Sequence, residues 1–142
     1  MNKLIAVLGG LSVAQAALPA GFPTTCNDDA GYVVCDDNTD FTGVSIVGTG
    51  YTNMLDLSNA VLRGATFRWA DIEFVNFQSA DLFGTLWRQI DSFQSVSFQN
   101  ANLEDATIIT PCQTCNFMGT NLFNANIPGD IQSANVGSGT CL

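Results

Sequence analysis

The sequence contains no histidine, and its only lysine is Lys3. Without histidine, the Ser/His and Cys/His nucleophile pairs are excluded, as are metal sites that need an imidazole ligand. The sequence also lacks a phosphate-binding glycine loop and a dinucleotide-binding fingerprint. We therefore expect no enzymatic activity, no cofactor and no histidine-bound metal.

Basic residues are scarce throughout the chain. Four lysines and arginines stand against thirteen aspartates and glutamates, which gives a net charge of −9. Such an acidic chain is poorly suited to nucleic acid or to an anionic membrane surface, because both require cationic contacts. No apolar run reaches the roughly 18 residues of a membrane-spanning helix. We therefore expect neither nucleic acid nor membrane among the partners.

The N-terminus has the parts of a secretory signal peptide. Lys3 supplies a positive start, residues 4–13 are apolar, and residues 14–16 (Ala-Gln-Ala) fit the small-x-small cleavage pattern. Residues 1–16 are therefore predicted to be removed, which leaves three arginines against thirteen acidic residues, a net charge of −10. The protein is expected to be secreted, to the extracellular space or, in a bacterium, to the periplasm.

All five cysteines follow the predicted cleavage site, where an oxidising compartment permits disulfides. The odd number leaves one thiol unpaired or paired with another chain. We favour a bridge between Cys26 and Cys35. Cys141 is expected to tie the C-terminal tail to Cys112 or Cys115, with a local Cys112–Cys115 bridge as the alternative. The Cys-x-x-Cys spacing is typical of a redox pair, but it lacks the βαβ setting, so we predict a structural role.

Between Phe41 and Val136 an apolar residue returns every five positions, usually with a small residue two places before it. A period of five fits neither a helix nor a strand, so the chain must turn a corner at every repeat. Repetition at a fixed period is typical of a solenoid. The predicted central residues of the repeats are Phe41, Ile46, Tyr51, Leu57, Leu62, Phe67, Ile72, Phe77, Leu82, Trp87, Phe93, Phe98, Leu103, Ile108, Cys112, Phe117, Leu122, Ile127, Ile131 and Val136.

The tightest repeats read Ala-Asp-Leu at residues 80–82, Ala-Asn-Leu at 101–103, Thr-Asn-Leu at 120–122 and Ala-Asn-Ile at 125–127. This pattern resembles the pentapeptide-repeat family, whose signature is Ala-(Asp/Asn)-Leu-x-x. The resemblance implies an all-β fold, a right-handed quadrilateral parallel β-helix, in which the central residue and the residue two before it face inward. It implies no common catalytic residues. Four repeats to a turn give about five coils, a rod about 24 Å long at the spacing of paired strands.

The predicted organisation has four parts. Residues 1–16 are the signal peptide, 17–40 an N-terminal cap that covers the first coil's edge, 41–136 the solenoid, and 137–142 a C-terminal tail. An uncovered strand edge invites further pairing. Because the tail is a weak cover, end-to-end self-association is a predicted means of protecting that end.

Every fourth central residue should stack inside the rod, because like shapes pack without voids. One predicted column is Phe41, Leu62, Leu82, Leu103 and Leu122, and another is Leu57, Phe77, Phe98, Phe117 and Val136.

The spacing departs from five in three places. It is six between Tyr51 and Leu57 and between Trp87 and Phe93, and four between Ile108 and Cys112. The second departure puts a carboxylate at an inward position, which is costly. We expect a bulge that turns Asp91 outward, with Ile90 partly in its place. Trp87 is large for an inward site.

The three arginines define a candidate interaction patch of Arg63, Arg68, Trp69, Phe83 and Arg88. Arg68 and Arg88 should stack one coil apart on an outward position, with Arg63 on the adjoining face. Trp69 and Phe83 should point outward nearby, and arginine and tryptophan are enriched in binding hot spots. The alternative is that the arginines form surface ion pairs with Asp71, Glu73, Asp81 or Glu104.

Residues 36–40 (Asp-Asp-Asn-Thr-Asp) offer oxygen ligands of the kind that Ca²⁺ prefers. The segment lacks the glycine and the distal glutamate of an EF-hand loop. Asp36, Asp37 and Asp40 are therefore only a weak calcium candidate, and we favour a solvated acidic turn.

These features predict a secreted, non-enzymatic solenoid that acts as a structural or binding surface for a protein or an extracellular polymer. One alternative follows from the resemblance, since some bacterial family members inhibit type II topoisomerases by mimicking DNA. The export signal argues against it. Another alternative is an ice- or mineral-surface binder. It needs regular threonine columns, and the predicted outward column is mixed, with Ser45, Thr66, Leu86, Thr107 and Asn126.

Overall fold

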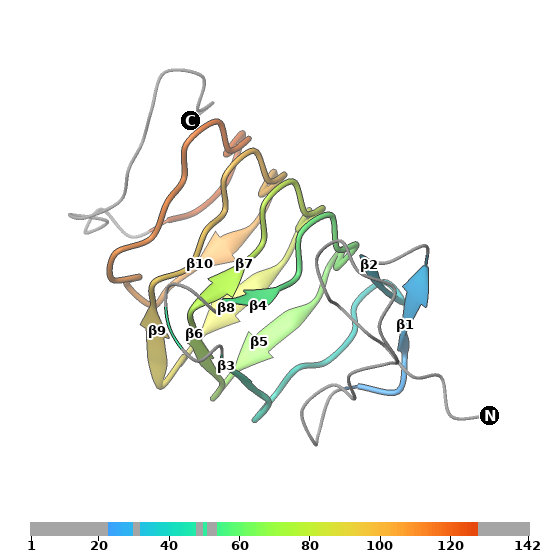
Figure 1. Ribbon diagram of the computed structural model, residues 1–142. Helices are drawn as coiled ribbons and strands as arrows, with labels where there is room; N and C mark the ends of the chain where they lie inside the picture. Colours follow the sequence, from blue (N-terminus) through green and yellow to red (C-terminus); the bar gives the residue numbers. More distant parts are fainter. Residues whose placement is uncertain (1–22, 30–31, 48–49, 51–53, 128–142) are drawn as a thin grey trace.

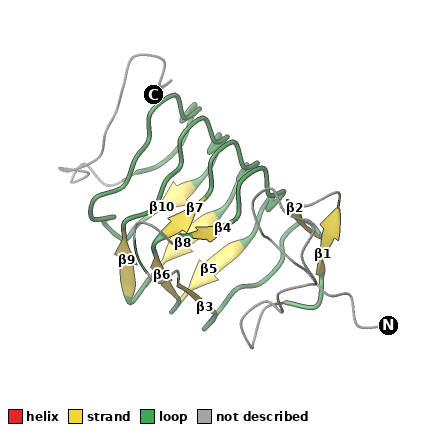
Figure 2. Ribbon diagram, viewed as in Figure 1, coloured by secondary structure: helices red, strands yellow, loops and turns green. Residues whose placement is uncertain are grey.

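The computed structural model describes residues 23–29, 32–47, 50 and 54–127, and all regular elements in these ranges are strands (Figures 1 and 2). No helix long and apolar enough to cross a membrane occurs in the described part of the chain. The strands are β1 (Cys26–Asp29), β2 (Tyr32–Cys35), β3 (Ser45–Val47), β4 (Leu55–Asp56), β5 (Thr66–Arg68), β6 (Asp71–Glu73), β7 (Val75–Asn76), β8 (Leu86–Arg88), β9 (Ser92–Gln94) and β10 (Thr107–Ile108).

Apart from the antiparallel β1–β2 hairpin, the strands pair in parallel with strands of the next coil. They form three sheets, ordered β10-β8-β5, β3-β6-β9 and β4-β7. A fourth line, here called the bridge ladder, consists of isolated parallel bridges that join Val34, Val61, Asp81, Asn102 and Asn121. The predicted all-β parallel solenoid is confirmed, and the successive coils are visible in Figure 1. Its handedness, quadrilateral outline and number of coils stay predictions.

The predicted inward positions form the core. Tyr51, Ile131 and Val136 lie outside the described residues, and Ile127 is partly buried. The other central residues, from Phe41 to Leu122, are at most 5% exposed. The small residues two places earlier are buried as well, including Ala60, Ala65, Ala80, Ala101 and Thr120. The five-residue period therefore identified the buried face of the chain.

The stacking of columns agrees with the prediction from Leu57 onward. Strand pairs and bridges align Leu62, Leu82, Leu103 and Leu122 in one column, and Leu57, Phe77, Phe98 and Phe117 in another.

The first coil departs from the predicted stacking. Phe41 was wrongly placed above Leu62, because its ring stacks on Phe67 with centroids 4.8 Å apart. Ser45 was likewise misplaced above Thr66, because it pairs with Asp71. The reason is that the first coil is longer than the second. Ile46 pairs with Ile72 and Leu55 with Val75, so the first coil advances nine residues where the second advances three. Ile46 and Leu57 thus lie on consecutive ladders.

The extra residue between Trp87 and Phe93 is accommodated as predicted. Phe67 pairs with Trp87 and Ile72 with Phe93, so the third coil is one residue longer at this corner. Asp91 is exposed, and Ile90 is buried at 6% exposure. The corner therefore turns the carboxylate outward and fills the core with an aliphatic side chain.

Trp87 is fully buried at an inward position. Its ring stacks on Phe67 with centroids 3.9 Å apart. The indole Nε1–H donates to Thr85 Oγ1 at 2.7 Å, and this hydroxyl donates to the Leu82 carbonyl oxygen at 2.8 Å. A polar group at the small inward position thus satisfies the only hydrogen-bonding atom of the indole, which makes burial of the large ring favourable.

The corners of the coils are of two kinds. The bridge ladder and the β4-β7 sheet are here called the turn side. A backbone hydrogen bond closes each of their corners. For example, Ala60 N–H donates to Leu57 O at 3.2 Å and Ala65 N–H donates to Leu62 O at 3.1 Å. The β10-β8-β5 and β3-β6-β9 sheets form the strand side. From Leu57 on, its corners in the described residues lack such a bond. At most corners of both kinds the residue two after the central one has a positive φ.

The N-terminal hairpin lies at one end of the solenoid (Figure 1). The structure joins Cys26 to Cys35, the predicted pair. Val34 forms a parallel bridge with Val61, and Val33 and Cys35 are buried, so β2 also begins the bridge ladder.

The second disulfide joins Cys112 to Cys115. This is the local alternative, and the expected bridge from one of these residues to the C-terminal tail is not formed. Cys141 lies outside the described residues.

Candidate functional site

Arg68 and Arg88 lie side by side as the last residues of β5 and β8. Together with Arg63, they are all the arginines in the sequence, and they occupy two successive coils. Arg63 lies in the turn that leads into β5, so the three side chains border one sheet from both ends of its strands. We call Arg63, Arg68, Trp69, Phe83 and Arg88, together with the outward face of the β10-β8-β5 sheet, the arginine patch.

At one end of these strands, Arg68 stacks on Trp69. The guanidinium Cζ lies 3.8 Å from the ring centroid, and Arg68 Nε donates to Gln89 Oε1 at 3.1 Å. Trp69 is 48% exposed and has φ 49°, a left-handed conformation that is uncommon for a bulky residue. The Arg88 side chain is exposed and makes no hydrogen bond or ion pair within the described residues. This end therefore presents a cation, an indole ring and a second, unengaged guanidinium to solvent.

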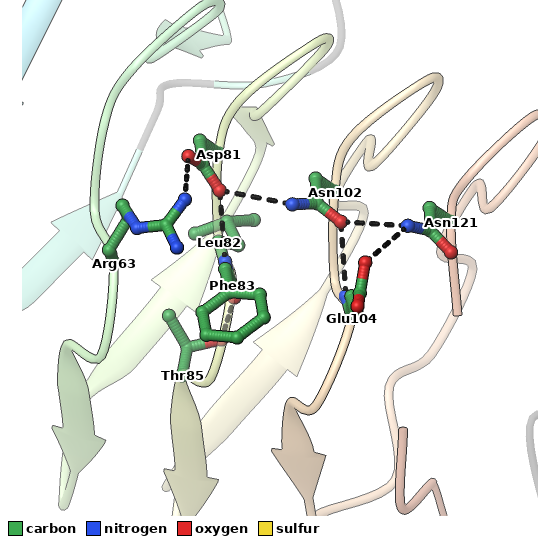
Figure 3. Close-up of polar contacts among 8 residues, drawn as sticks. All are labelled: Arg63, Asp81, Leu82, Phe83, Thr85, Asn102, Glu104 and Asn121. Carbon is green, nitrogen blue, oxygen red and sulfur yellow. Dashed lines mark hydrogen bonds and ion pairs between the residues drawn. The ribbon is translucent and has the colours of Figure 1, made fainter. Parts of the chain in front are cut away.

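At the other end, Arg63 contacts both an acid and a ring (Figure 3). Its Nη1 donates to Asp81 Oδ2 at 2.8 Å, and its Cζ lies 4.5 Å from the centroid of the Phe83 ring. The Arg63 side chain remains 42% exposed. Of the ion pairs that sequence analysis considered, this one forms. Arg68 and Arg88 have none within the described part of the chain.

A line of side-chain hydrogen bonds holds Asp81 in place (Figure 3). Asn102 Nδ2 donates to Asp81 Oδ1 at 3.2 Å, and Asn121 Nδ2 donates to Asn102 Oδ1 at 3.0 Å. The same oxygens accept backbone N–H groups two residues on, Phe83 at 3.2 Å from Asp81 and Glu104 at 3.3 Å from Asn102. The Asp/Asn of the repeat therefore both closes its own turn and bonds to the next coil.

Sequence analysis treated Asp81 as a candidate ion-pair partner and Asn102 and Asn121 as parts of the repeat signature, and it missed this line. The signal that could have revealed it is their alignment at the coil period, because stacked amides can donate and accept along the rod. The line fixes the turn of Phe83 and the carboxylate that Arg63 binds, so it positions one end of the arginine patch.

Asp40 lies at the edge of the patch, where it pairs with Thr66 at the start of β5. Its Oδ1 accepts the Thr42 hydroxyl at 2.6 Å and the Thr42 N–H at 2.9 Å. These two bonds, the hydroxyl first, hold the pKa of Asp40 below its ordinary value, and the Arg68 charge adds to them against a small opposing effect of burial.

The weak calcium candidate gains no support from the described residues. They contain no group of three or more acidic, histidine or cysteine side chains placed to hold a metal ion, and this includes Asp36, Asp37 and Asp40.

A hollow of about 290 Å³ lies next to Arg63. Its lining comes from corners of three successive coils, with Asp37 and Asn38 from the first, Arg63 and Gly64 from the second, and Phe83 and Gly84 from the third. Sequence analysis did not predict it, because the Asp37–Asn38 corner precedes the region where the five-residue repeat is regular.

These observations define a parallel β-solenoid with polar lines on its corners and an exposed arginine patch. Residues 55–86 match the family model described as pentapeptide repeats, with eight copies. Over this stretch the predicted resemblance to the pentapeptide-repeat family is confirmed.

Two solved structures are similar to this chain. A pentapeptide repeat protein from the thylakoid lumen of Arabidopsis thaliana is 22% identical, with 72% of this chain and 80% of that chain covered and a TM-score of 0.32. A pentapeptide repeat protein from the cyanobacterium Cyanothece is 17% identical, with 76% and 90% covered and a TM-score of 0.25. No curated protein matches the sequence. Because both TM-scores are low, the fold assignment rests on the family match and on the strand pairing of the chain itself.

Proposed function

We propose that this protein is a secreted, non-enzymatic binding module that recognises a protein or an extracellular polymer through the arginine patch. One observation carries the proposal: two guanidinium–aromatic stacks border a single sheet on a chain whose net charge is −9. Cation–π stacks order arginine side chains before a partner binds, which lowers the ordering cost of binding, and arginine and tryptophan dominate interface energetics.

The backbone at Trp69 supports this proposal. A bulky residue at φ 49° costs of order 1 kcal/mol or more, and such strain concentrates at functional sites. The ring gains little burial in return, because Trp69 is 48% exposed. An exposed, strained tryptophan that stacks on an arginine is therefore more readily explained by recognition than by folding.

Secretion is supported by the N-terminal sequence pattern and by two disulfides, which persist in oxidising compartments. The lack of histidine in the whole sequence supports a non-enzymatic role. On the β10-β8-β5 sheet the outward column is Asp40, Thr66, Leu86, Thr107 and Asn126, a mixture that offers no regular threonine face to ice.

The proposal is tested by capture from the native extracellular fraction with immobilised mature protein, comparing two double variants of equal charge change. Arg68→Gln with Arg88→Gln alters the patch, whereas Gln78→Glu with Gln99→Glu alters two turn positions outside it, after Phe77 and Phe98. The amount of captured partner is expected to fall at least about tenfold in the first variant and to stay unchanged in the second. Equal capture by both variants and the wild type would remove the arginine patch as the binding surface.

A further inference from the structure

We propose that the hollow beside Arg63 binds one neutral sugar ring of an extracellular polysaccharide. The inference rests on the proposed function, since it names the chemistry of a polymeric partner. The hollow measures about 290 Å³ and is lined by side chains and backbone of three coils. This is the small end of the range of ligand pockets, about 300–1,000 Å³, which fits a single ring better than an extended ligand.

Two glycines that line the hollow differ in what surrounds them. Gly64 and Gly84 occupy equivalent corners of successive coils, each with φ +66°. A Cβ at Gly64 would collide with Asn38 Oδ1, so the first coil closes over this corner. A Cβ at Gly84 would meet no atom within 4 Å, so the hollow is open at this corner and has room for a side chain. The next corner of the same ladder carries Asp105, which shows that the backbone itself does not require glycine at this position.

The walls supply the groups that a polyhydroxylated ring needs. Arg63 presents a planar set of N–H donors, and its side chain is 42% exposed. The exposed Asp37 and Asn38 supply carboxylate and amide oxygens, so a hydroxyl group can donate to one wall and accept from the other. Phe83 adds an apolar surface for the C–H groups of the ring. Its backbone is held by the N–H bond to Asp81, and Arg63 lies over one face of the ring.

The local charge favours a neutral ligand over an acidic one. Arg63 is already paired with Asp81 at 2.8 Å, and Asp37 adds a second carboxylate, so one positive group faces two negative ones. The whole chain is also strongly acidic. A uronic acid or a phosphate would be repelled by this field, whereas hydroxyl groups interact with both charged walls.

The test is calorimetric titration with defined probes: the hexasaccharides of β-1,3-glucose, β-1,4-glucose, mannose and N-acetylglucosamine, with hexagalacturonate as the acidic probe. At least one neutral hexasaccharide is expected to bind, and hexagalacturonate is not. Gly84→Asn fills the hollow with a residue that tolerates positive φ, and it should weaken binding at least about tenfold. Gly43→Asn is the matched control, because Gly43 has φ +72° and also meets open space, but lies outside the hollow.

Arg63→Lys is a second variant, which retains a charge for Asp81 but loses the planar fork. It should weaken sugar binding several-fold with little change in melting temperature. Binding of no neutral probe, equal binding by Gly84→Asn and the wild type, or equal binding of hexagalacturonate would overturn the proposal. Sugar binding should persist in Arg68→Gln with Arg88→Gln. If that variant loses capture of the native partner while no neutral sugar binds the wild type, the proposed function stands and the sugar site falls.

Discussion

The turn side and the strand side of the solenoid solve the same problem with different residues. Both must bend the chain after every central residue, and most corners do so through a residue with positive φ. On the turn side this position holds residues suited to it, namely Asn59, Gly64, Ser79, Gly84, Asn100, Asp105, Gly119 and Asn124. On the strand side the same position holds Gly43 in the first coil and then Trp69, Phe74, Gln89, Ser95 and Thr114.

This difference indicates that the turn side stabilises the fold, whereas the strand side serves recognition. On the turn side, residue type, backbone conformation and hydrogen bonding agree, which is the mark of a sequence that specifies its structure. Asp81 and Asn102 there are bonded both within their turn and to the next coil. On the strand side, a bulky Trp69 adopts an unfavourable conformation and Arg88 is left unengaged within the described residues. A mismatch between residue type and backbone conformation is expected where a surface serves binding.

The largest effect should come from the core that both sides share. Trp87 lies under the strand side, but the hydroxyl of Thr85 connects its indole to the Leu82 carbonyl of the turn side. Trp87→Ala should lower the free energy of unfolding by about 3–5 kcal/mol in urea denaturation, because a fully buried ring is lost. Trp87→Phe keeps the stack and loses the hydrogen bond, at about 1 kcal/mol. A loss below about 1 kcal/mol for Trp87→Ala would show that the core is not built as described.

The two disulfides test the sides separately. Cys26 and Cys35 are nine positions apart and hold β2, which begins the bridge ladder of the turn side. Cys26→Ala with Cys35→Ala should cost about 2–3 kcal/mol by the entropy of loop closure. Cys112→Ala with Cys115→Ala opens a strand-side loop of sequence separation three, so the loss of stability should be smaller. The reverse order, measured by thermal and urea unfolding, would contradict this assignment.

A single charge should matter more on the turn side than on the strand side. Asn102→Asp places a second carboxylate 3.2 Å from Asp81 and removes a donor, so it should cost about 1–3 kcal/mol at pH 7. Gln89→Glu adds the same charge next to Arg68 and should change stability by less than about 1 kcal/mol.

The pH dependence of Asn102→Asp has a defined sign. Repulsion raises the folded-state pKa of the new carboxyl, so the destabilisation is complete above that pKa and is relieved as the pH falls through it. Urea denaturation of the variant and the wild type between pH 4 and pH 7 measures this. The prediction is contradicted if the difference in the free energy of unfolding between wild type and variant stays constant, or grows as the pH falls. Asp81 and residue 102 would then not share a hydrogen bond.

The smallest effect concerns the edge of the arginine patch. Because the Thr42 hydroxyl is the main cause of the lowered pKa of Asp40, Thr42→Val should raise that pKa towards its ordinary value, and Arg68→Gln should raise it less. A lowered carboxyl pKa stabilises the fold above the unfolded-state pKa, and this contribution is lost as the pH falls through the folded-state value. NMR titration of the Asp40 carboxyl checks both shifts. A larger rise of the Asp40 pKa in Arg68→Gln than in Thr42→Val would show that the Arg68 charge, and not the Thr42 hydroxyl, is its main cause.

Sequence reasoning succeeded where the repeat alone determines the structure. The period of five predicted the buried central residues and the columns from Leu57 onward, because one residue per corner must face inward. It failed for Phe41, since the first coil has nine positions from Ile46 to Leu55 where the next coil has three from Ile72 to Val75. Spacing alone does not show which residues pair when successive coils differ in length.

The candidate site was also predicted in part. The coil period placed Arg68 above Arg88, and the structure has them paired. The line from Asp81 to Asn121 and the hollow beside Arg63 were missed, because both depend on side chains of different coils meeting at a corner. A period gives the alignment of positions, whereas contacts at corners depend on turn type and side-chain direction.

The most direct test of this division between the two sides is Trp69→Asn, measured for stability and for partner capture together. Asparagine tolerates the left-handed conformation, so relief of strain should offset the lost Arg68 stack and leave the free energy of unfolding unchanged or raised by up to about 1 kcal/mol. Capture of the partner should fall at least about tenfold. A stability loss of more than about 1 kcal/mol with capture intact would contradict the account, because Trp69 would then serve the fold and not recognition.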